Sequence, residues 1–507
     1  MQRGTAAVRR ATAVWLTLAA LTAVLGPARS AVAAPQRPES RLEVALREAR
    51  SYALHQLART DRRLGPGRYP TVAVGDGMWR TSGTNGWLAG FWPGRLWLGY
   101  ELTGDRAWAR RAVTRQAPLA VRADDTSAHD LGFLLQTSFG AGADLLGRPD
   151  DAAVVRRAAA ALATRFVPSV GALRSWDGPN GRTTVIVDSL MNLPLLFWAA
   201  DHGGPEQWRA VAVQHALTVA RWQVRPDGST FHVVRFDDAS GQPVWSGTVQ
   251  GLADWSTWAR GQSWAVHGFT AAYDTSRDPR LLDAARRTAA FAVEHLPADG
   301  VPWWDYDAPG TQRDTTAAAV LASGLLDLAR VDPDPARRST WRTAGLHTLR
   351  SLVGPRYLAK GTASWSVLLH GRHDPTYDDA GVTYGDHYLL EALLRVQLLP
   401  STRAALPVDA VRALAGGGVR ADLGATKQVS AVSVRWRHGT TAATRFVVQV
   451  SSDGDRWATV RGGVSSRRSA ALETYDLRDR AARYVRVRPL GSTDGSSGRV
   501  LRLVVRR

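Results

Sequence analysis

The sequence predicts a large helical toroid followed by a small β-sandwich. From Ser40 to about Pro400, segments of 12–18 residues with helical spacing alternate with loops rich in Gly and Trp. After Leu406 the helical spacing gives way to alternating apolar and polar residues, with turn residues between the runs. Hydrophobic residues make up 45% of the 507-residue chain, which is enough for a sizeable core and excludes a disordered protein.

The N-terminus has the three parts of a secretory signal. Met1–Arg10 is basic, Ala11–Gly26 is apolar, and Ala31-Val32-Ala33 supplies the small residues of a cleavage site. The apolar run is shorter than the ~20 residues of a membrane anchor. We therefore expect residues 1–34 to be removed and the mature protein to be secreted, with no membrane partner. The Arg9-Arg10 pair leaves both Sec and twin-arginine export open.

The helical region covers residues 35–400. Many of the 20 Trp residues stand in its loops, together with His and Asp. An ordinary bundle would place Trp inside helices, whereas aromatic faces exposed in a cleft are surfaces on which sugar rings pack. We therefore predict a toroid that binds its ligand at one rim. The predicted helices are Arg41–Leu57, Asp151–Phe166, Glu206–Trp222, Pro279–Leu296, Thr315–Arg330, Arg338–Leu352 and Tyr384–Leu398.

The predicted β-sandwich covers residues 407–507, after a linker at residues 401–406. It carries 19 Lys or Arg against 8 Asp or Glu, a net +11 of the chain's +19, whereas residues 35–406 carry only +4. A basic small domain favours an acidic partner such as a polyanionic glycan. The alternative is that its outward strand positions are simply Arg. The alternating runs are Val429–Trp436, Thr444–Val450, Arg483–Arg488 and Val500–Val505.

Several kinds of chemistry are excluded by what the chain lacks. It has no Cys, which excludes disulfides, zinc–thiolate sites, iron–sulfur clusters and a Cys nucleophile. The helical region has no phosphate-binding glycine loop, no His-Glu-x-x-His helix and no Gly-x-Ser-x-Gly elbow. Acid chemistry based on Asp is what remains.

Two Asp residues stand in unusually apolar settings. Asp130 lies in the run His129–Leu135, and Asp188 lies in the run Val185–Leu193. Desolvation by such neighbours should raise the pKa of a carboxyl and suit it to give and take a proton. The alternative for either residue is that it caps a helix that starts just after it.

Three later segments add polar groups. Asp227–His232 offers an imidazole, Thr248–Gly251 offers an amide, and Trp255–Trp264 places Arg260 among three Trp. A guanidinium walled by aromatic rings is poorly hydrated and binds carboxylates in bidentate fashion, so this run favours a uronic-acid substrate. The alternative for Arg260 is an ion pair with a structural Asp.

At these residues the sequence resembles the unsaturated glucuronyl hydrolases, which are six-hairpin (α/α)6-barrel enzymes. The resemblance spans roughly Arg41 to Val396, with seven motifs in register. It implies an all-α (α/α)6 barrel in front of the β-sandwich. The matching stretches are Gly86–Gly94, the segments around Asp130 and Asp188, Arg225–His232, Trp258–Trp264, Trp303–Asp307 with Arg313-Asp314, and Tyr384–Tyr388.

Enzymes of this family remove the 4,5-unsaturated uronic acid that polysaccharide lyases leave at a non-reducing end, by hydrating its vinyl ether. Because the anomeric carbon is not attacked, the carboxylate-spacing rule for retaining and inverting glycosidases does not apply. The resemblance implies that Asp188 protonates C4 and helps to activate the water that adds at C5, while Asp130 assists. It implies no metal and no organic cofactor.

The resemblance also implies the substrate contacts. The expected partner is an unsaturated uronic-acid oligosaccharide, held by aromatic walls and a few polar groups. The aromatic residues are Trp87, Phe91, Trp176, Trp258 and Trp264, and the polar residues are His129, His232, Gln250 and Arg260.

The C-terminal domain resembles a discoidin-type (coagulation-factor C-terminal) module. Only Pro407 to Arg420 precedes the first matching stretch, which is shorter than usual and would omit part of the binding loops. Two roles therefore stay open, the binding of acidic polysaccharide and a structural domain docked on the barrel. The matching stretches are Ala421–Ala425, Val448–Trp457 and Ala482–Val487.

Two other functions stay open. One is an unsaturated rhamnogalacturonyl hydrolase, which has a related barrel and similar Asp chemistry, and the other is a non-catalytic glycan-binding protein on an inactive barrel. The Trp258–Trp264 run and the Asp130 segment favour the glucuronyl branch, and the presence of both Asp residues favours catalysis. Nucleic acid is not expected as a partner, because the basic domain has no recognisable stacking motif.

Overall fold

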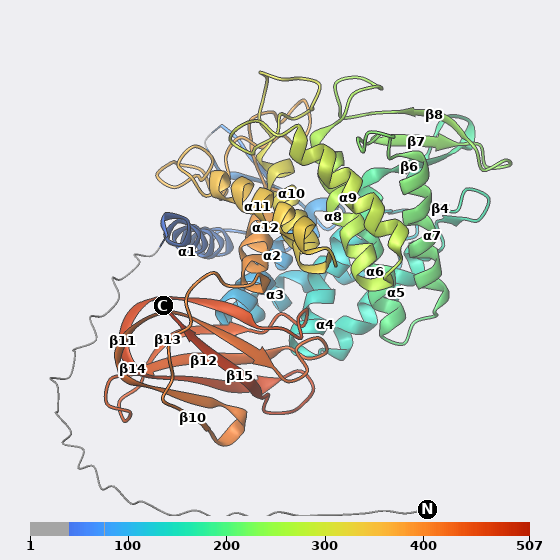
Figure 1. The fold of residues 1–507 in the computed structure, drawn as a ribbon. Coiled ribbons are helices and arrows are strands. Elements are labelled where there is room, and N and C mark those ends of the chain that lie inside the picture. Colours follow the sequence, from blue (N-terminus) through green and yellow to red (C-terminus); the bar gives the residue numbers. More distant parts are fainter. Residues whose placement is uncertain (1–39, 76) are drawn as a thin grey trace, which may run out of the picture. The chain divides into compact units, whose positions relative to one another are not determined.

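The computed structural model describes residues 40–75 and 77–507, so the predicted signal at residues 1–34 lies outside the described residues. The long helices lie between Arg41 and Arg395, with short strands among them, and the long strands follow from Ala410 onward (Figure 1). Within these two ranges, no helix is long and apolar enough to cross a membrane. The helices are α1 (Arg41–Asp61), α2 (Phe91–Thr103), α3 (Arg106–Gln116), the π-helix η3 (Gly132–Gly140), α4 (Ala141–Leu146), α5 (Pro149–Ala163), α6 (Leu193–Asp201), α7 (Gln207–Trp222), α8 (Ala259–Ser276), α9 (Pro279–Glu294), α10 (Thr315–Val331), α11 (Pro335–Leu352) and α12 (Thr383–Arg395).

The helices form two concentric layers. In the inner layer α2 contacts η3, η3 contacts α6, and α8, α10 and α12 follow in turn until α12 returns to α2. Each inner helix also contacts an outer one: α3 packs on α2, α5 on η3, α7 on α6, α9 on α8, α11 on α10 and α1 on α12. This closed ring of six hairpins is an (α/α)6 barrel, which confirms the predicted fold class of the helical region.

The two layers differ in sequence because they differ in surroundings. Every residue of the inner helix α10 except Arg330 is buried, since α10 is packed against α8, α11 and α12. Its surface is rich in Ala, which lets these neighbouring helices approach closely. The Asp314 side chain caps the N-terminus of α10 by accepting the Thr316 N–H at 2.8 Å. The outer helix α9 instead buries one apolar stripe that includes Leu281, Ala285 and Ala289.

Small antiparallel sheets stand in the loops between the barrel helices. One pairs β3 (Phe166–Val167) with β4 (Ala172–Leu173). Of the two larger sheets, the first has the strand order β5-β6-β7-β8 and the other has the order β2-β1-β9. The first sheet matters most here because it carries two of the predicted site residues at one edge. Its strands are β5 (Trp176–Asp177), β6 (Thr183–Ile186), β7 (Val233–Phe236) and β8 (Pro243–Gly247), and those of the other sheet are β1 (Tyr69–Ala73), β2 (Trp79–Ser82) and β9 (Gly381–Val382).

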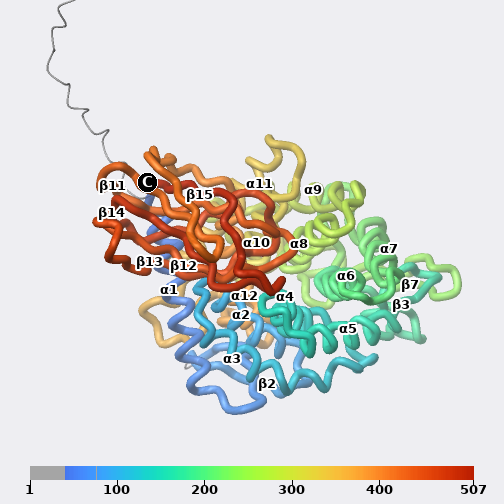
Figure 2. The backbone as a smooth tube through the Cα atoms, turned by 90° about the horizontal axis from the view of Figure 1, so that it is seen from below, coloured from blue at the N-terminus to red at the C-terminus, as the bar shows by residue number. Residues whose placement is uncertain are grey.

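The C-terminal strands gather into a β-sandwich (Figure 1, Figure 2). Two long strands, β11 and β14, run through both layers of the sandwich. One layer has the strand order β10-β11-β14-β12-β13. In the other layer, β15 pairs with the second half of β11. Trp436, Phe446 and Tyr475 fill the core, with ring centroids 4.9 and 4.5 Å apart. The strands are β10 (Ala410–Ala413), β11 (Val419–Trp436), β12 (Thr444–Ser451), β13 (Ala458–Val464), β14 (Glu473–Ser492) and β15 (Val500–Arg506).

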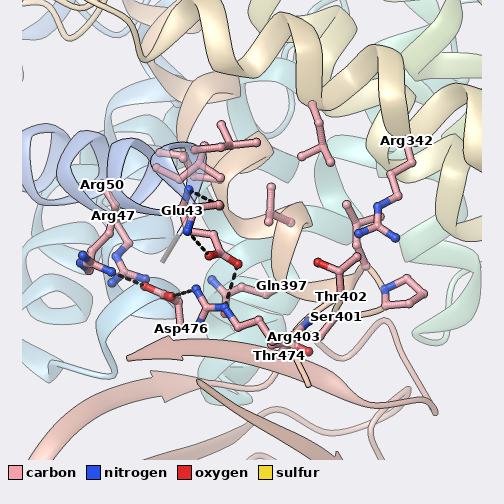
Figure 3. Close-up of a pocket in the computed structure, with 18 residues that line it drawn as sticks. Glu43, Arg47, Arg50, Arg342, Gln397, Ser401, Thr402, Arg403, Thr474 and Asp476 are labelled. Atoms are coloured by element: carbon pink, nitrogen blue, oxygen red, sulfur yellow. Dashed lines mark hydrogen bonds and ion pairs between the residues drawn. The ribbon is translucent and has the colours of Figure 1, made fainter. Parts of the chain in front are cut away.

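The predicted linker at residues 401–406 lies along β15, where the Leu406 N–H donates to the Val505 carbonyl at 2.8 Å. Arg403 in this segment joins the barrel to the sandwich. Its guanidinium pairs with Glu43 of α1 at 2.7 Å and with Asp476 of β14 at 2.5 Å (Figure 3). These residues border a pocket of about 200 Å³ whose walls come from both domains.

Candidate active site

The register of two strands brings Asp188 and His232 together. β6 and β7 pair antiparallel with Ile186 opposite Val233, the last residue of one strand and the first of the other. Asp188 follows the end of β6 and His232 precedes β7, so both lie at the same edge of the sheet. The Val187 N–H donates to the His232 carbonyl at 2.9 Å and holds the two segments together beyond that edge.

The carboxyl of Asp188 is buried without a hydrogen-bond partner at one of its oxygens. Its side chain is 13% exposed, and its Oδ2 faces His232 Nε2 at 3.5 Å. Burial raises the pKa of Asp188 to about 7; the nearby Arg260 opposes this shift and Asp130 adds to it. Near neutral pH this carboxyl is present in both protonation states, which suits a group that donates and accepts a proton.

His232 is neutral, and its hydrogen bonds define its tautomer. Burial lowers the pKa of His232 to about 3. The Val249 N–H donates to Nδ1 at 3.3 Å. Thr248 Oγ1 accepts the Gly251 N–H at 2.7 Å and lies 3.2 Å from Nδ1, to which it can donate its own proton. Nδ1 is therefore an acceptor, so Nε2 carries the proton on the side of Asp188.

Asp130 stands just before η3, and Asn192 holds its carboxylate. The Asn192 Nδ2 donates to Asp130 Oδ1 at 3.3 Å, while its own Oδ1 accepts the Phe133 N–H at 3.1 Å. Gly132 permits this approach, because a Cβ there would lie 2.4 Å from the Asn192 Cα. π-Helical segments often occur at functional sites. The helix-capping alternative is not observed for Asp130 or for Asp188, since neither side chain caps the adjoining helix.

Arg260 lies in the first turn of α8 and is only 2% exposed. Its guanidinium pairs with Asp314 at 3.3 Å and donates to Gln250 Oε1 at 2.6 Å and to the His373 carbonyl at 2.8 Å. The Trp258 ring covers it, with the guanidinium carbon 4.4 Å from the ring centroid. Of the two roles left open for Arg260, the structure shows the ion pair with an Asp. Binding of a substrate carboxylate stays a prediction.

Aromatic side chains form one continuous wall beside these groups. The half-buried Trp87 stacks on Tyr384 with centroids 5.7 Å apart and packs on Phe133 at 5.4 Å. Phe91 and Trp264 pack against Phe133 with centroids 5.5 and 5.4 Å away, and both are fully buried. In the structure they support the exposed rings, and their contact with a substrate stays a prediction.

The other predicted residues complete the same neighbourhood. His129 Nδ1 lies 3.2 Å from Asp130 Oδ1, and its ring packs on the half-buried Trp176 with centroids 5.7 Å apart. Trp258 is nearly buried and packs on His232 at 4.4 Å. Trp176 belongs to β5, which pairs with β6, and the sheet therefore links it to the catalytic candidates.

Several contacting residues were not singled out in the sequence. Asn192 stands four residues after Asp188, but an amide near an Asp carries no signal of its own. Tyr384 was part of a matching motif without an assigned role, and His373, whose ring stacks on Trp87 at 6.1 Å, was in no motif. Within the described residues, no cluster of His, Asp and Glu is placed to hold a metal ion.

A buried carboxyl poised near neutral pH, a neutral imidazole and an aromatic wall can together perform proton transfer on a sugar. Several proteins are similar to this chain in sequence and fold. An unsaturated glucuronyl hydrolase from Formosa agariphila is 38% identical over 327 residues, which are 62% of this chain and 80% of that protein. Another, from Bacillus sp. strain GL1, is 35% identical over 362 residues, which are 68% of this chain and 95% of that protein.

A solved structure gives the same result for the fold. The crystal structure of an unsaturated glucuronyl hydrolase specific for heparin superposes with a TM-score of 0.67 and 36% identity, covering 70% of this chain and 97% of that one. Residues 417–503 match the F5/8 type C domain family, which confirms the predicted discoidin-like module. The chain therefore belongs to the unsaturated glucuronyl hydrolases, glycoside hydrolases that act on unsaturated uronyl residues.

Proposed function

We propose that this protein is secreted and removes a 4,5-unsaturated glucuronyl residue from the non-reducing end of polysaccharide-lyase products by hydrating its vinyl ether. The observation that carries the proposal is the buried Asp188 carboxyl, whose Oδ2 has no hydrogen-bond partner and whose pKa is raised to about 7 by burial. A carboxyl kept partly protonated at neutral pH can act as a general acid there.

The reaction follows from two proton transfers at one carboxyl. The protonated Asp188 donates its proton to C4 of the sugar, and the positive charge that develops is shared by C5 and the ring oxygen. Water adds at C5 and returns a proton to the Asp188 carboxylate, which restores the starting state. The product is a hemiketal that opens and releases the shortened sugar. One water is consumed, and no bond to the enzyme forms.

The neighbouring residues have distinct parts in this scheme. His232 Nε2–H, 3.5 Å from Asp188 Oδ2, stabilises the carboxylate that forms after the first transfer. Asp130, held by Asn192, assists Asp188 and stabilises the developing positive charge. Trp87 and Trp176 are only half-buried and offer rings against which the sugars pack.

The loss of ultraviolet absorbance tests this function, because hydration destroys the conjugated double bond. The mature protein is incubated with unsaturated disaccharides made by chondroitin, heparin, hyaluronan, ulvan, gellan and pectin lyases. We expect loss of absorbance with at least one glucuronyl product and release of the second sugar. Activity confined to a rhamnogalacturonan-derived product would favour the rhamnogalacturonyl alternative, and no activity on any product would reject the proposal.

The pH dependence of kcat/KM is expected to have an alkaline limb near pH 7. Because Asp188 must be protonated to donate a proton to C4 and its pKa is raised to about 7, activity should fall about tenfold per pH unit above that value. Initial rates from pH 5 to 9 at constant ionic strength measure this limb. A profile that stays flat between pH 7 and 9 would contradict the assignment of Asp188 as the acid.

Secretion is supported by the three-part pattern of residues 1–34. N-terminal sequencing of protein recovered from the culture medium tests it, and a first residue near Pro35 is the outcome that agrees with cleavage. Protein that keeps Met1 and stays with the cells would reject export.

The C-terminal domain is proposed to bind acidic polysaccharide. Its support is the net charge of +11 in residues 407–507 and the match to the F5/8 type C family. Retention on a heparin or ulvan matrix at low salt tests this role, since contacts between charged groups weaken as salt screens them. Such binding would hold the enzyme near the polymers from which its substrates are cut.

A further inference from the structure

Three arginines stand opposite one another across three neighbouring strands of the C-terminal domain. Arg412 of β10 is opposite Arg420 of β11, and Arg420 is opposite Arg486 of β14. Directly opposite residues point to the same face of a sheet, with Cβ atoms about 5 Å apart. Gln449 of β12 continues the row and accepts the Arg486 Nε–H at 2.8 Å. We call Arg412, Arg420 and Arg486 the arginine ladder.

The arginine ladder is unfavourable for the domain by itself, because like charges directly opposite one another destabilise a sheet. Burial lowers the pKa of Arg486, and the charges of Arg488 and Arg420 lower it further. Within residues 40–75 and 77–507, none of the three arginines forms an ion pair. The charge of Arg420 helps to lower the pKa of Asp422, but the ion pair of that carboxylate is with Arg483. Binding of an anion would therefore relieve the repulsion within the arginine ladder.

Aromatic rings hold the guanidinium groups in place. The Arg486 guanidinium carbon lies 3.9 Å from the centroid of Trp457, and that of Arg420 lies 4.3 Å from the centroid of Tyr484. Trp457 is itself anchored, since its Nε1–H donates to the Gly454 carbonyl at 3.0 Å. A guanidinium stacked on a ring keeps its N–H edges available for bidentate bonds to carboxylate or sulfate, with less freedom to lose on binding.

Two acidic side chains of neighbouring segments form their bonds with other groups. Asp422 pairs with Arg483 through two contacts of 3.0 and 3.3 Å. Asp453 accepts the backbone N–H groups of Asp455 and Arg456, each at 2.9 Å, and so closes its own turn. These bonds occupy both carboxylates, and neither forms an ion pair with the arginine ladder.

We propose that the arginine ladder is the polyanion site of this domain and binds a chain of carboxylate- or sulfate-bearing sugars that crosses β10, β11 and β14. The inference rests on the proposed polysaccharide-binding role and assigns it to a sheet face. Three arginines spaced by one strand each cover about 10 Å, so a repeating polyanion can contact them with successive acidic groups. The contacts are ionic and bidentate, and the affinity depends strongly on salt.

The composition of the row favours a polysaccharide over other anionic partners. Beyond the arginine ladder it continues with the polar residues Gln449 and Thr459, which bond to each other, and these positions offer no apolar group to insert into a membrane. Trp457 and Tyr484 are engaged by the arginines, which leaves no free pair of rings for the stacking of nucleic-acid bases.

A charge-matched pair of double variants tests the assignment in the full mature chain. Arg420→Gln/Arg486→Gln removes two arginines of the ladder. The control, Arg435→Gln/Arg502→Gln, removes two exposed arginines that also stand opposite each other, but on β11 and β15 and without a stacked ring. Binding to heparin and to a uronate-rich polymer is measured at several salt concentrations, with thermal unfolding to confirm that both variants fold.

The ladder variant is expected to raise the Kd at least about tenfold, and the slope of log Kd against log salt is expected to fall by the equivalent of about two ionic contacts. The control is expected to change the Kd less than about threefold. Equal losses in the two variants would reject the arginine ladder as the binding site, since total charge alone would then govern binding. Tighter binding of anionic lipid vesicles or single-stranded DNA than of polysaccharide would reject polysaccharide as the ligand. Disaccharide turnover by the wild-type chain is measured in parallel, so a failure of the catalytic proposal is seen separately.

Discussion

Asp188→Asn is expected to lower kcat on an unsaturated disaccharide by at least about 1,000-fold, because one carboxyl serves both proton transfers and general acid–base catalysis supplies about 100- to 10,000-fold per positioned group. The amide keeps the shape of the side chain but has no proton to give at neutral pH. The apolar setting and the raised pKa of Asp188 are the grounds for this expectation. Loss of ultraviolet absorbance measures it.

A second catalytic variant and a surface control accompany this experiment. Asp130→Asn is also expected to abolish turnover, since Asp130 lies beside His129 and is oriented by Asn192. Asp283→Asn on α9 is the matched control, because this side chain is 70% exposed and forms only a surface ion pair with Arg287. Near wild-type turnover in Asp188→Asn, or an equal loss in the control, would remove Asp188 from the mechanism.

The same substitution is expected to stabilise the protein above pH 7. Folding raises the pKa of Asp188 from the ordinary 3.8 to about 7, so the carboxyl's contribution to stability is fully present below pH 3.8 and is lost as the pH rises through 7. An amide never pays this desolvation cost. Asp188→Asn should therefore increase the free energy of unfolding by about 4 kcal/mol at pH 8 and by less than about 1 kcal/mol at pH 4.

Urea denaturation of the two proteins at pH 4 and pH 8 measures this difference, and Asp283→Asn again serves as the control, with no pH-dependent gain expected. An Asp188→Asn variant with the same stability as the wild type at pH 8 would show that the carboxyl is not desolvated. Together the two experiments test whether the Asp188 carboxyl lowers stability at neutral pH and is nevertheless needed for proton transfer.

The helices of the outer layer except α3 could be read from the sequence, and most of the inner ones could not. Outer helices such as α9 have one apolar stripe and one polar face, so their spacing is visible along the chain. The inner helices α6 and α8 are buried on nearly all sides and show no such contrast. α10 was predicted because it is long and rich in helix formers, whereas α6 is short and begins Leu193-Pro194, which obscures it.

The catalytic candidates were visible for a different reason. Asp130 and Asp188 stand out because a carboxyl among apolar residues is rare unless it has a partner or a task. Their partners were not visible, since Asn192 contacts Asp130 from 62 positions away and Asp314 pairs with Arg260 from 54. Neither separation leaves a local pattern in the chain.

Local spacing and composition predict a helical region with two Asp residues in apolar settings, followed by a basic strand-rich domain. They are enough for that, because burial imposes periodicity on each element separately. The ion pair of Arg260 with Asp314, the His232 Nε2–H that faces Asp188, and the row of Arg412, Arg420 and Arg486 became visible in the folded chain. These facts depend on strand register and helix packing, which are settled by contacts between residues far apart in the chain.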